Sequence, residues 1–104
     1  MFSIEKHDDG EGTVTLSLHG QFDFNVYTDF KPKQTQALET PGTQYIVLDL
    51  SNLDYLDSAA LGTLLLLREK AQNRNIEIVL SNVSGVVQEI LEIAHFQRMF
   101  RFLD

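Results

Sequence analysis

An almost uninterrupted apolar segment, Tyr45–Leu50, limits the possible folds more than any other feature of the sequence. Such continuous runs are typical of strands covered on both faces, as the strands of parallel sheets are. Farther along the chain, a helix is expected from Ser58 to about Gln72 and another strand from Ile76 to Leu80. Strand, helix and strand in this order indicate a βαβ crossover, so the sequence predicts an α/β domain.

The rest of the chain predicts an opening hairpin and two more helices. Clean alternation over residues 13–19 and looser alternation over residues 2–7 flank the turn-rich segment Asp8–Gly12, as in a β-hairpin. The other expected elements are a loop over 20–25, a helix from about 28 to 38 with Thr28 or Asp29 as its cap, a loop over 51–57, a helix from Ser84 to about His95 and a short strand over 99–103. If the first helix begins before Thr28, Pro32 should kink it. These elements predict a mixed sheet of four to five strands packed with three or more helices.

Length and charge narrow the classes of protein. The 104 residues suffice for one domain, expected to span 1–104. Asp and Glu together number 15 against 8 Lys and Arg, for a formal net charge of −7. The basic residues are scattered, and neutralising phosphates requires clustered Lys and Arg, so nucleic acid is not expected as the main partner.

Apolar segments and cysteine content limit location and chemistry. The longest apolar stretch, Leu64–Leu67, is far shorter than the roughly 20 residues that cross a bilayer, so no membrane insertion is expected. The segment Met1–Lys6 has no basic stretch followed by an apolar run. Without a visible secretory signal, a cytoplasmic protein is expected. The absence of cysteine excludes disulfides, thiolate metal sites and cysteine nucleophiles.

The start of the helix at Ser58 has several features of a functional surface. Asp57 and Ser58 precede the apolar run, and either residue could be the N-cap. Leu66 and Ala59 fall on the far side of the helix, close to Gly62 and on the flank of Ser58. This arrangement indicates a docking surface, or else a single exposed leucine of no special role. The core face predicted from about 100° per residue consists of Ala60, Leu61, Leu64, Leu65, Leu67 and Ala71.

The segment Asp49–Gly62 resembles the signature of the STAS family, in which a strand ending in aspartate and a short loop precede Asp-Ser at a helix start. Gly20–Asp23 and Asn82–Ser84 are similar to the family's first and last loops. The resemblance covers almost the whole chain and implies a single STAS-like α/β domain. Two residues depart from the pattern, because Ala60 and His95 stand where the family usually has glycine.

Within that family the chain resembles the anti-sigma factor antagonists. The resemblance implies a bacterial signalling protein, itself not an enzyme and without a cofactor, that regulates transcription by switching partners. An anti-sigma factor that is also a serine kinase would bind the unphosphorylated protein and phosphorylate Ser58; a metal-dependent PP2C-type phosphatase would reverse the modification. Asp23, Asp57, Ser58, Ala59, Gly62 and Leu66 would then contact the partner. A phosphate at a helix N-terminus should be tolerated by the fold, while its charge of about −1.5 to −2 repels the partner.

Other functions remain open from the sequence. STAS domains also serve as unphosphorylated interaction subunits of transport or signalling assemblies, and some are thought to sense nucleotides. Asp49, Asp54 and Asp57 could suggest a metal or phosphoaspartate site as in receiver domains, although the early acidic pair and the late lysine of receivers are missing. The three histidines lie on different elements without metal-site spacing. A monomer is expected, but the sequence does not determine the oligomeric state.

Overall fold

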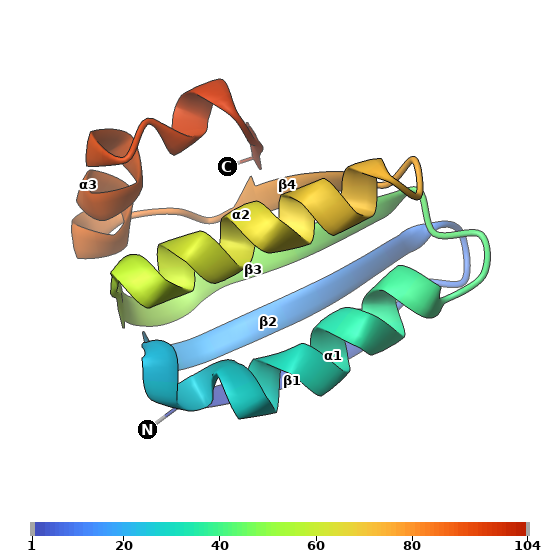
Figure 1. The fold of residues 1–104 in the computed structure, drawn as a ribbon, viewed down its shortest axis with the longest axis horizontal. Coiled ribbons are helices and arrows are strands. Elements are labelled where there is room, and N and C mark those ends of the chain that lie inside the picture. Colours follow the sequence, from blue (N-terminus) through green and yellow to red (C-terminus); the bar gives the residue numbers. More distant parts are fainter. Residues whose placement is uncertain (1, 104) are drawn as a thin grey trace.

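A computed structural model describes residues 2–103, in which five strands form one mixed sheet in the order β1-β2-β3-β4-β5 (Figure 1). The strands are β1 (Phe2–Asp8), β2 (Thr13–Phe22), β3 (Tyr45–Leu56), β4 (Glu77–Ser81) and β5 (Arg101–Leu103). β1 pairs antiparallel with β2, and all other neighbouring strands are parallel. The predicted hairpin, crossover and mixed sheet are therefore confirmed.

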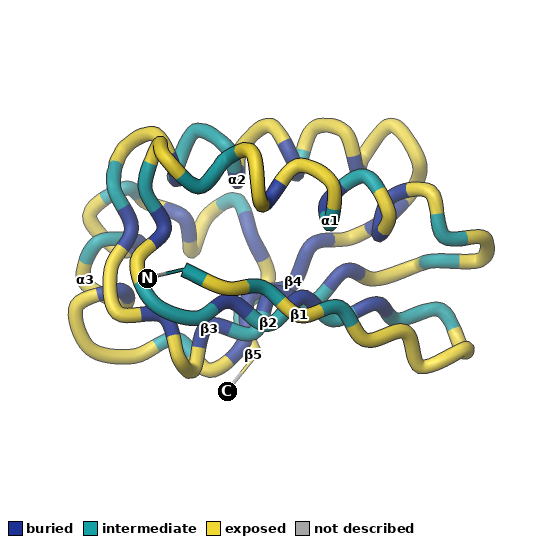
Figure 2. The backbone as a smooth tube through the Cα atoms, turned by 90° about the horizontal axis from the view of Figure 1, so that it is seen from below, coloured by how far each residue is buried: buried dark blue, intermediate teal, exposed yellow. Residues whose placement is uncertain are grey.

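Three helices connect the parallel strands. They are α1 (Tyr27–Glu39), α2 (Ser58–Gln72) and α3 (Gly85–Ile93), and two short 3-10 turns, η1 (Phe24–Val26) and η2 (Phe96–Arg98), precede α1 and β5. α1 and α2 lie on one face of the sheet, and α3 lies at the end of the molecule where α2 begins (Figures 1 and 2). Among residues 2–103, no helix has both the length and the apolar character needed to cross a bilayer.

The core lies between the sheet and the pair α1 and α2. Alternate residues of the two central strands point into it and are buried, among them Leu16 on β2 and Leu48 on β3. α2 contributes one stripe of buried residues, Ala60, Leu64, Leu67 and Ala71. Burying a leucine side chain contributes about 1.5–3 kcal/mol to folding, so this stripe fixes which side of α2 faces the sheet and which side faces outward.

β3 is longer than the sequence predicts, because Ser51–Leu56 continues the strand and only Asp57 lies between it and α2. Two irregularities in the pairing with β2 shift the register: after the first, His19 pairs with Asn52, and after the second, Phe22 pairs with Leu56. Bulges of this kind disturb the alternation of apolar residues, which is why the segment has the sequence pattern of a loop. The extension brings the ends of β2 and β3 to the start of α2.

The connection from β2 to α1 also differs from the prediction. β2 continues to Phe22, so the expected loop at residue 20 begins later. α1 begins at Tyr27, and the residue at its N-cap, Val26, makes no side-chain capping bond, so the predicted caps at Thr28 and Asp29 are wrong. Instead, Asp23 accepts a hydrogen bond from the Asn25 N–H at 2.9 Å and caps η1. The chain thus turns into α1 through a separate capped turn.

The departure from glycine at His95 has a structural cost. α3 ends at Ile93, two residues earlier than predicted, and His95 has the left-handed backbone conformation, with φ 61°. Such a conformation costs a residue with a Cβ about 1–2 kcal/mol, whereas glycine adopts it freely but loses more entropy on folding. We expect His95→Gly to raise the free energy of unfolding by about 0.5–1 kcal/mol in urea denaturation. A less stable variant would contradict this interpretation.

Candidate functional site

The predicted site lies where β2 and β3 end and α2 begins, at one end of the molecule (Figure 1). Asp57 is the only residue between β3 and α2, and its N–H donates to the Phe22 carbonyl at 3.1 Å. This bond extends the pairing of the two strands by one residue. The backbone at the start of α2 is therefore held directly against the end of β2.

Both carboxylate oxygens of Asp57 accept hydrogen bonds from backbone N–H groups. Oδ1 accepts from Ala60 at 2.9 Å, which makes Asp57 the N-cap of α2. Oδ2 accepts from Phe24 at 3.2 Å, across 33 residues of chain. One side chain thus caps the helix and holds η1 beside it. Of the two capping residues that the sequence left open, the structure selects Asp57.

Ser58 is the first residue of α2 and is exposed. Among the hydrogen bonds of residues 2–103, none involves its hydroxyl. Since Asp57 caps the helix, the hydroxyl has no structural task in α2. The N–H groups of Ser58 and Ala59 belong to the first turn, where backbone donors have no partner within the helix.

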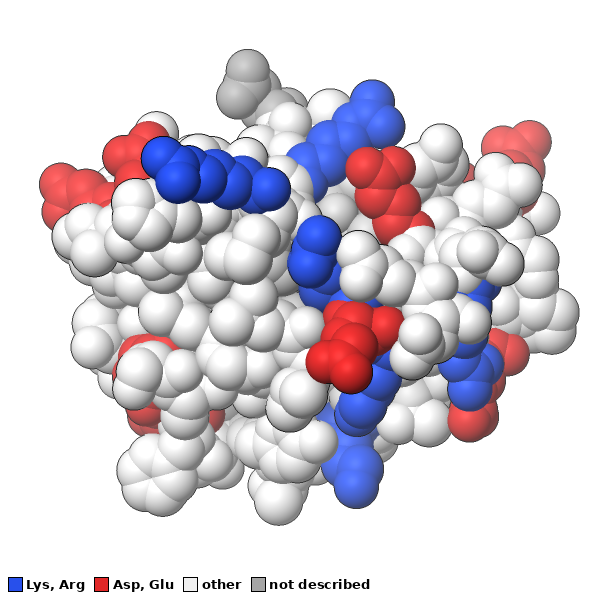
Figure 3. All heavy atoms as spheres, turned by 45° about the horizontal axis from the view of Figure 1, so that its top comes forward, with Lys and Arg blue, Asp and Glu red and all other residues white. Residues whose placement is uncertain are grey.

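An apolar groove begins beside Ser58, between the first turns of α2 and the residues that lead into α1. It encloses about 580 Å³ and is lined by Phe24, Tyr27, Ala59, Gly62, Thr63, Leu65, Leu66 and Glu69. Phe24 is 69% exposed and Leu66 is 53% exposed, and both line the same groove, so they form a contiguous apolar area and not scattered single residues. Figure 3 shows a broad area without charged residues on the half of the molecule where α2 begins. We call the eight lining residues the apolar groove.

The structure brings the predicted residues together, and the apolar groove adds five further residues to them. Ala59, Gly62 and Leu66 line the groove, and Asp23 immediately precedes Phe24 at its rim. Leu65 was predicted on the core face, but it is 38% exposed and lines the groove, because the stripe that packs on the sheet is narrower than the predicted arc. Phe24 and Tyr27 were missed. The sequence did contain one signal for Phe24, because this aromatic residue directly follows Asp23 in a segment predicted to be a loop.

The fold does not require a glycine at position 62 in the apolar groove. Gly62 lies in the interior of α2, and a Cβ built there would meet no atom within 4 Å apart from its chain neighbours and the backbone of its own helix. We expect Gly62→Ala to raise the free energy of unfolding by up to about 1 kcal/mol, because alanine is the better helix former. Gly62→Leu should fold as well and fill part of the groove. Thermal denaturation of both variants tests this, and a destabilised Gly62→Ala protein would show that the glycine serves the fold.

Asp49 lies within β3 and pairs with Ser81, the last residue of β4. Its Oδ1 accepts hydrogen bonds from the Asn82 side chain at 3.1 Å and from the Ser51 N–H at 3.0 Å. Burial raises the pKa of Asp49, but these hydrogen bonds outweigh it and hold the pKa below its ordinary value. The carboxylate thereby ties β3 to the residue after β4. Within residues 2–103, no three acidic or histidine side chains lie close enough to share a metal ion.

Comparisons with known proteins agree with this architecture. The STAS domain family matches residues 3–104. A STAS-domain containing protein of Pseudomonas aeruginosa (strain UCBPP-PA14) is 43% identical over 88 residues, 85% of each chain. An anti-sigma F factor antagonist of Paenibacillus polymyxa is 23% identical over 93 residues, 89% of this chain and 80% of that protein.

Solved structures share the fold at low sequence identity. The anti-sigma factor antagonist SpoIIAA in its unphosphorylated form has a TM-score of 0.76 at 19% identity, with 98% of this chain and 88% of that one covered. SpoIIAA of Bacillus in the phosphorylated form has a TM-score of 0.73 at 16% identity, with 96% and 90% covered. A sulfate transporter family protein from Wolinella succinogenes has a TM-score of 0.75 at 22% identity, with 93% and 88% covered. The chain therefore belongs to the STAS domain family and has the fold of the anti-sigma factor antagonists within it.

Proposed function

We propose that this protein is a phosphorylation-switched anti-sigma factor antagonist of the bacterial cytoplasm. In this proposal the unphosphorylated protein binds an anti-sigma factor that is also a serine kinase, and this binding releases the factor's other partner. Phosphorylation of Ser58 ends the interaction, and a PP2C-type phosphatase restores it. The protein itself acts by binding rather than by catalysis.

One observation carries the proposal: the Ser58 hydroxyl is exposed at a helix start that Asp57 already caps, beside an apolar groove. A kinase needs access to the hydroxyl, and its exposure supplies that access. A binding partner needs apolar area to bury, and Phe24, Leu65 and Leu66 supply it. The serine can therefore be modified without loss of a bond that stabilises the fold.

Electrostatics explains how a phosphate would end binding. A phosphoserine carries a charge of about −1.5 to −2 and would stand next to the Asp57 carboxylate, on a chain that is already acidic. In the free protein, water and the unpartnered N–H groups of the first turn would solvate the phosphate. In the complex, the partner would remove that water from two neighbouring negative groups, and such desolvation is costly unless the charge is paired.

Likeness to both forms of SpoIIAA supports a switch that leaves the fold in place. This chain matches the unphosphorylated form with a TM-score of 0.76 and the phosphorylated form with 0.73. Both values compare the fold of this chain with the fold of SpoIIAA. They agree with the expectation, from the exposed Ser58, that added charge acts on the surface and not on the core.

Intact-mass spectrometry tests the proposal. The purified protein is incubated with ATP and the anti-sigma factor kinase of the same organism, and the gain of one phosphate is expected. Ser58→Ala should gain none, and a PP2C-type phosphatase should return the modified protein to its original mass. Absence of modification, or modification of Ser58→Ala to the same extent, would remove Ser58 as the switch.

A second candidate function follows from the likeness to a sulfate transporter family protein, which is nearly as high as that to SpoIIAA. In that function the chain would be an interaction subunit of a transport or signalling assembly, and Ser58 would stay unmodified. The apolar groove would then bind its partner permanently. Failure of the mass experiment, together with partner binding that Gly62→Leu abolishes, would favour this alternative.

A further inference from the structure

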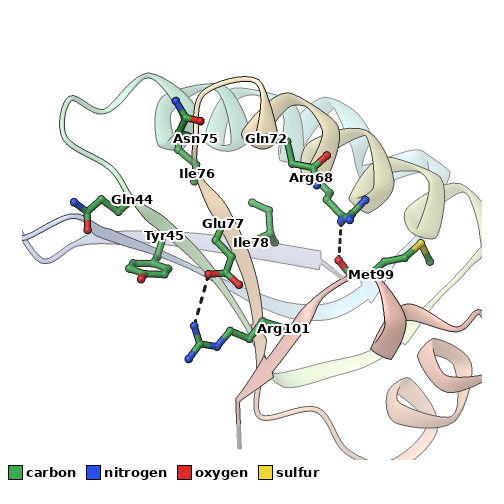
Figure 4. Close-up of a pocket in the computed structure, with 10 residues that line it drawn as sticks. All are labelled: Gln44, Tyr45, Arg68, Gln72, Asn75, Ile76, Glu77, Ile78, Met99 and Arg101. Atoms are coloured by element: carbon green, nitrogen blue, oxygen red, sulfur yellow. Dashed lines mark hydrogen bonds and ion pairs between the residues drawn. The ribbon is translucent and has the colours of Figure 1, made fainter.

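A second groove lies near the other end of α2. It encloses about 680 Å³ between α2, the start of β4 and the chain entering β5, and Figure 4 shows the residues that line it. They are Gln44, Tyr45, Arg68, Gln72, Asn75, Ile76, Glu77, Ile78, Met99 and Arg101. Arg68 lies ten positions after Ser58 on α2, a distance of about 15 Å along the helix. This polar groove shares no lining residue with the apolar groove.

Arg68 is held in place on the wall of the polar groove. Its Nε donates a hydrogen bond to the Met99 carbonyl at 2.6 Å, and its guanidinium carbon lies 5.9 Å from the centre of the Phe100 ring. Among residues 2–103, no hydrogen bond or ion pair involves its two terminal nitrogens. A guanidinium fixed through Nε presents those nitrogens to a ligand at little further cost in side-chain entropy, which suits a carboxylate.

Arg101 provides a second guanidinium group, which is only weakly paired. Its guanidinium lies 3.6 Å from a Glu77 carboxylate oxygen, and about half of each side chain is exposed. Exposed ion pairs of this kind contribute little, so an incoming carboxylate can compete with Glu77. Arg68, Arg101 and Glu77 together leave the groove with one net positive charge, on a chain whose formal charge is −7.

The floor and rim of the polar groove favour a peptide over a small anion. Ile76 and Ile78 form a buried apolar floor, whereas Gln44, Gln72 and Asn75 offer amide groups at the rim. Small ligands usually have about 70–90% of their surface buried, and this groove lies open on the molecular surface. Glu77 would also repel a phosphate dianion more strongly than a single carboxylate. An extended peptide that presents acidic and apolar side chains in turn on one face, at every second residue, matches the arginines, the apolar floor and the open shape of the groove.

We propose that the polar groove binds an extended acidic segment of a partner protein. The segment places a carboxylate against Arg68, a second one near Arg101 and an apolar side chain on Ile78. Because the polar groove is separate from the phosphorylation site, this interaction does not require unphosphorylated Ser58. It goes beyond the proposed switch and stands or falls independently of it.

NMR titration of the ¹⁵N-labelled full chain tests the proposal with the probe peptide acetyl-Ser-Glu-Ser-Val-Ser-Glu-Ser-amide, in which both Glu side chains and the Val side chain share one face when the peptide is extended. We expect shifts of the amides of residues 75–78 and 99–101, and of the Arg68 Nε–H. Arg68→Gln should weaken binding about tenfold, the size expected when a charge-assisted hydrogen bond is lost. Glu77→Gln should strengthen it a few fold, because it removes the repulsive carboxylate. This gain keeps the test decisive even if Arg68→Gln disturbs the fold.

Two controls distinguish specific binding of the peptide in the polar groove from nonspecific electrostatic attraction. Lys70→Gln removes one cation from an exposed position on the same helix outside the groove, and it should leave the affinity nearly unchanged. Ser58→Asp should bind the probe as the unchanged protein does. The proposal is overturned if about 1 mM peptide shifts no groove amide, if Lys70→Gln weakens binding as much as Arg68→Gln, or if the groove amides respond to protein concentration alone, as a dimer would make them do.

Discussion

Ser58→Asp is expected to weaken binding of the anti-sigma factor kinase by at least about 100-fold, while the free energy of unfolding stays nearly unchanged. The substitution places a permanent charge where the phosphate would be, at an exposed position whose hydroxyl makes no bond within the chain. Burial of that charge beside Asp57 in the complex is unfavourable unless the partner supplies a cation. Isothermal titration calorimetry with the purified kinase domain measures the effect.

Two matched variants separate charge from size. Ser58→Asn introduces a side chain of nearly the same volume as aspartate without the charge, and Ser58→Ala removes only the hydroxyl. Both should bind the kinase within a few fold of the unchanged protein and resist phosphorylation. If Ser58→Asn weakens binding as much as Ser58→Asp, the interface rejects the larger side chain, and electrostatic exclusion is not the mechanism of the switch.

Much of the fold follows from the sequence because its strongest patterns coincide with its most buried elements. The apolar run at Tyr45 predicted the central strand, and the helical pattern from Ser58 gave both ends of α2 correctly. The errors occur where contacts between distant segments determine the extent of an element. Bulged pairing with β2 carries β3 through a polar segment to Leu56, and no local pattern reports such pairing.

The sequence indicated the position of the candidate site, but it could not indicate the hydrogen bonds found there. A family motif marked Ser58, and helix geometry correctly placed Leu66 on the outer side of α2. That Asp57 also binds the Phe24 N–H could not be predicted, because this bond joins residues 33 positions apart. For the same reason Phe24 was not expected at the groove. Long-range bonds of single side chains have no periodic signature in a sequence.

Asp57→Ala should lower the free energy of unfolding by about 2 kcal/mol, roughly 1 for the lost N-cap and a similar amount for the bond to the Phe24 N–H. A loss of this size lowers the melting temperature by about 8–16 °C in a domain of this length. Asp57→Asn isolates the second contribution. Asparagine is an equally good N-cap, but its amide nitrogen cannot accept the Phe24 hydrogen bond, so about half of the loss is expected. Thermal denaturation followed by circular dichroism compares the variants.

The same variants also link the stability of the site to its function. Without the bond from Asp57, η1 is no longer fastened to α2, and Phe24 loses its fixed place at the rim of the apolar groove. Kinase affinity should therefore fall for both Asp57 variants even at temperatures where each is fully folded. Asp23→Ala is a control for stability alone, because Asp23 caps only the short turn η1 and its loss should cost less than about 1 kcal/mol. If Asp57→Asn is as stable as the unchanged protein and binds the kinase equally well, the bond between Asp57 and Phe24 does not organise the site, and the groove must be held by the packing of α1 against α2 alone.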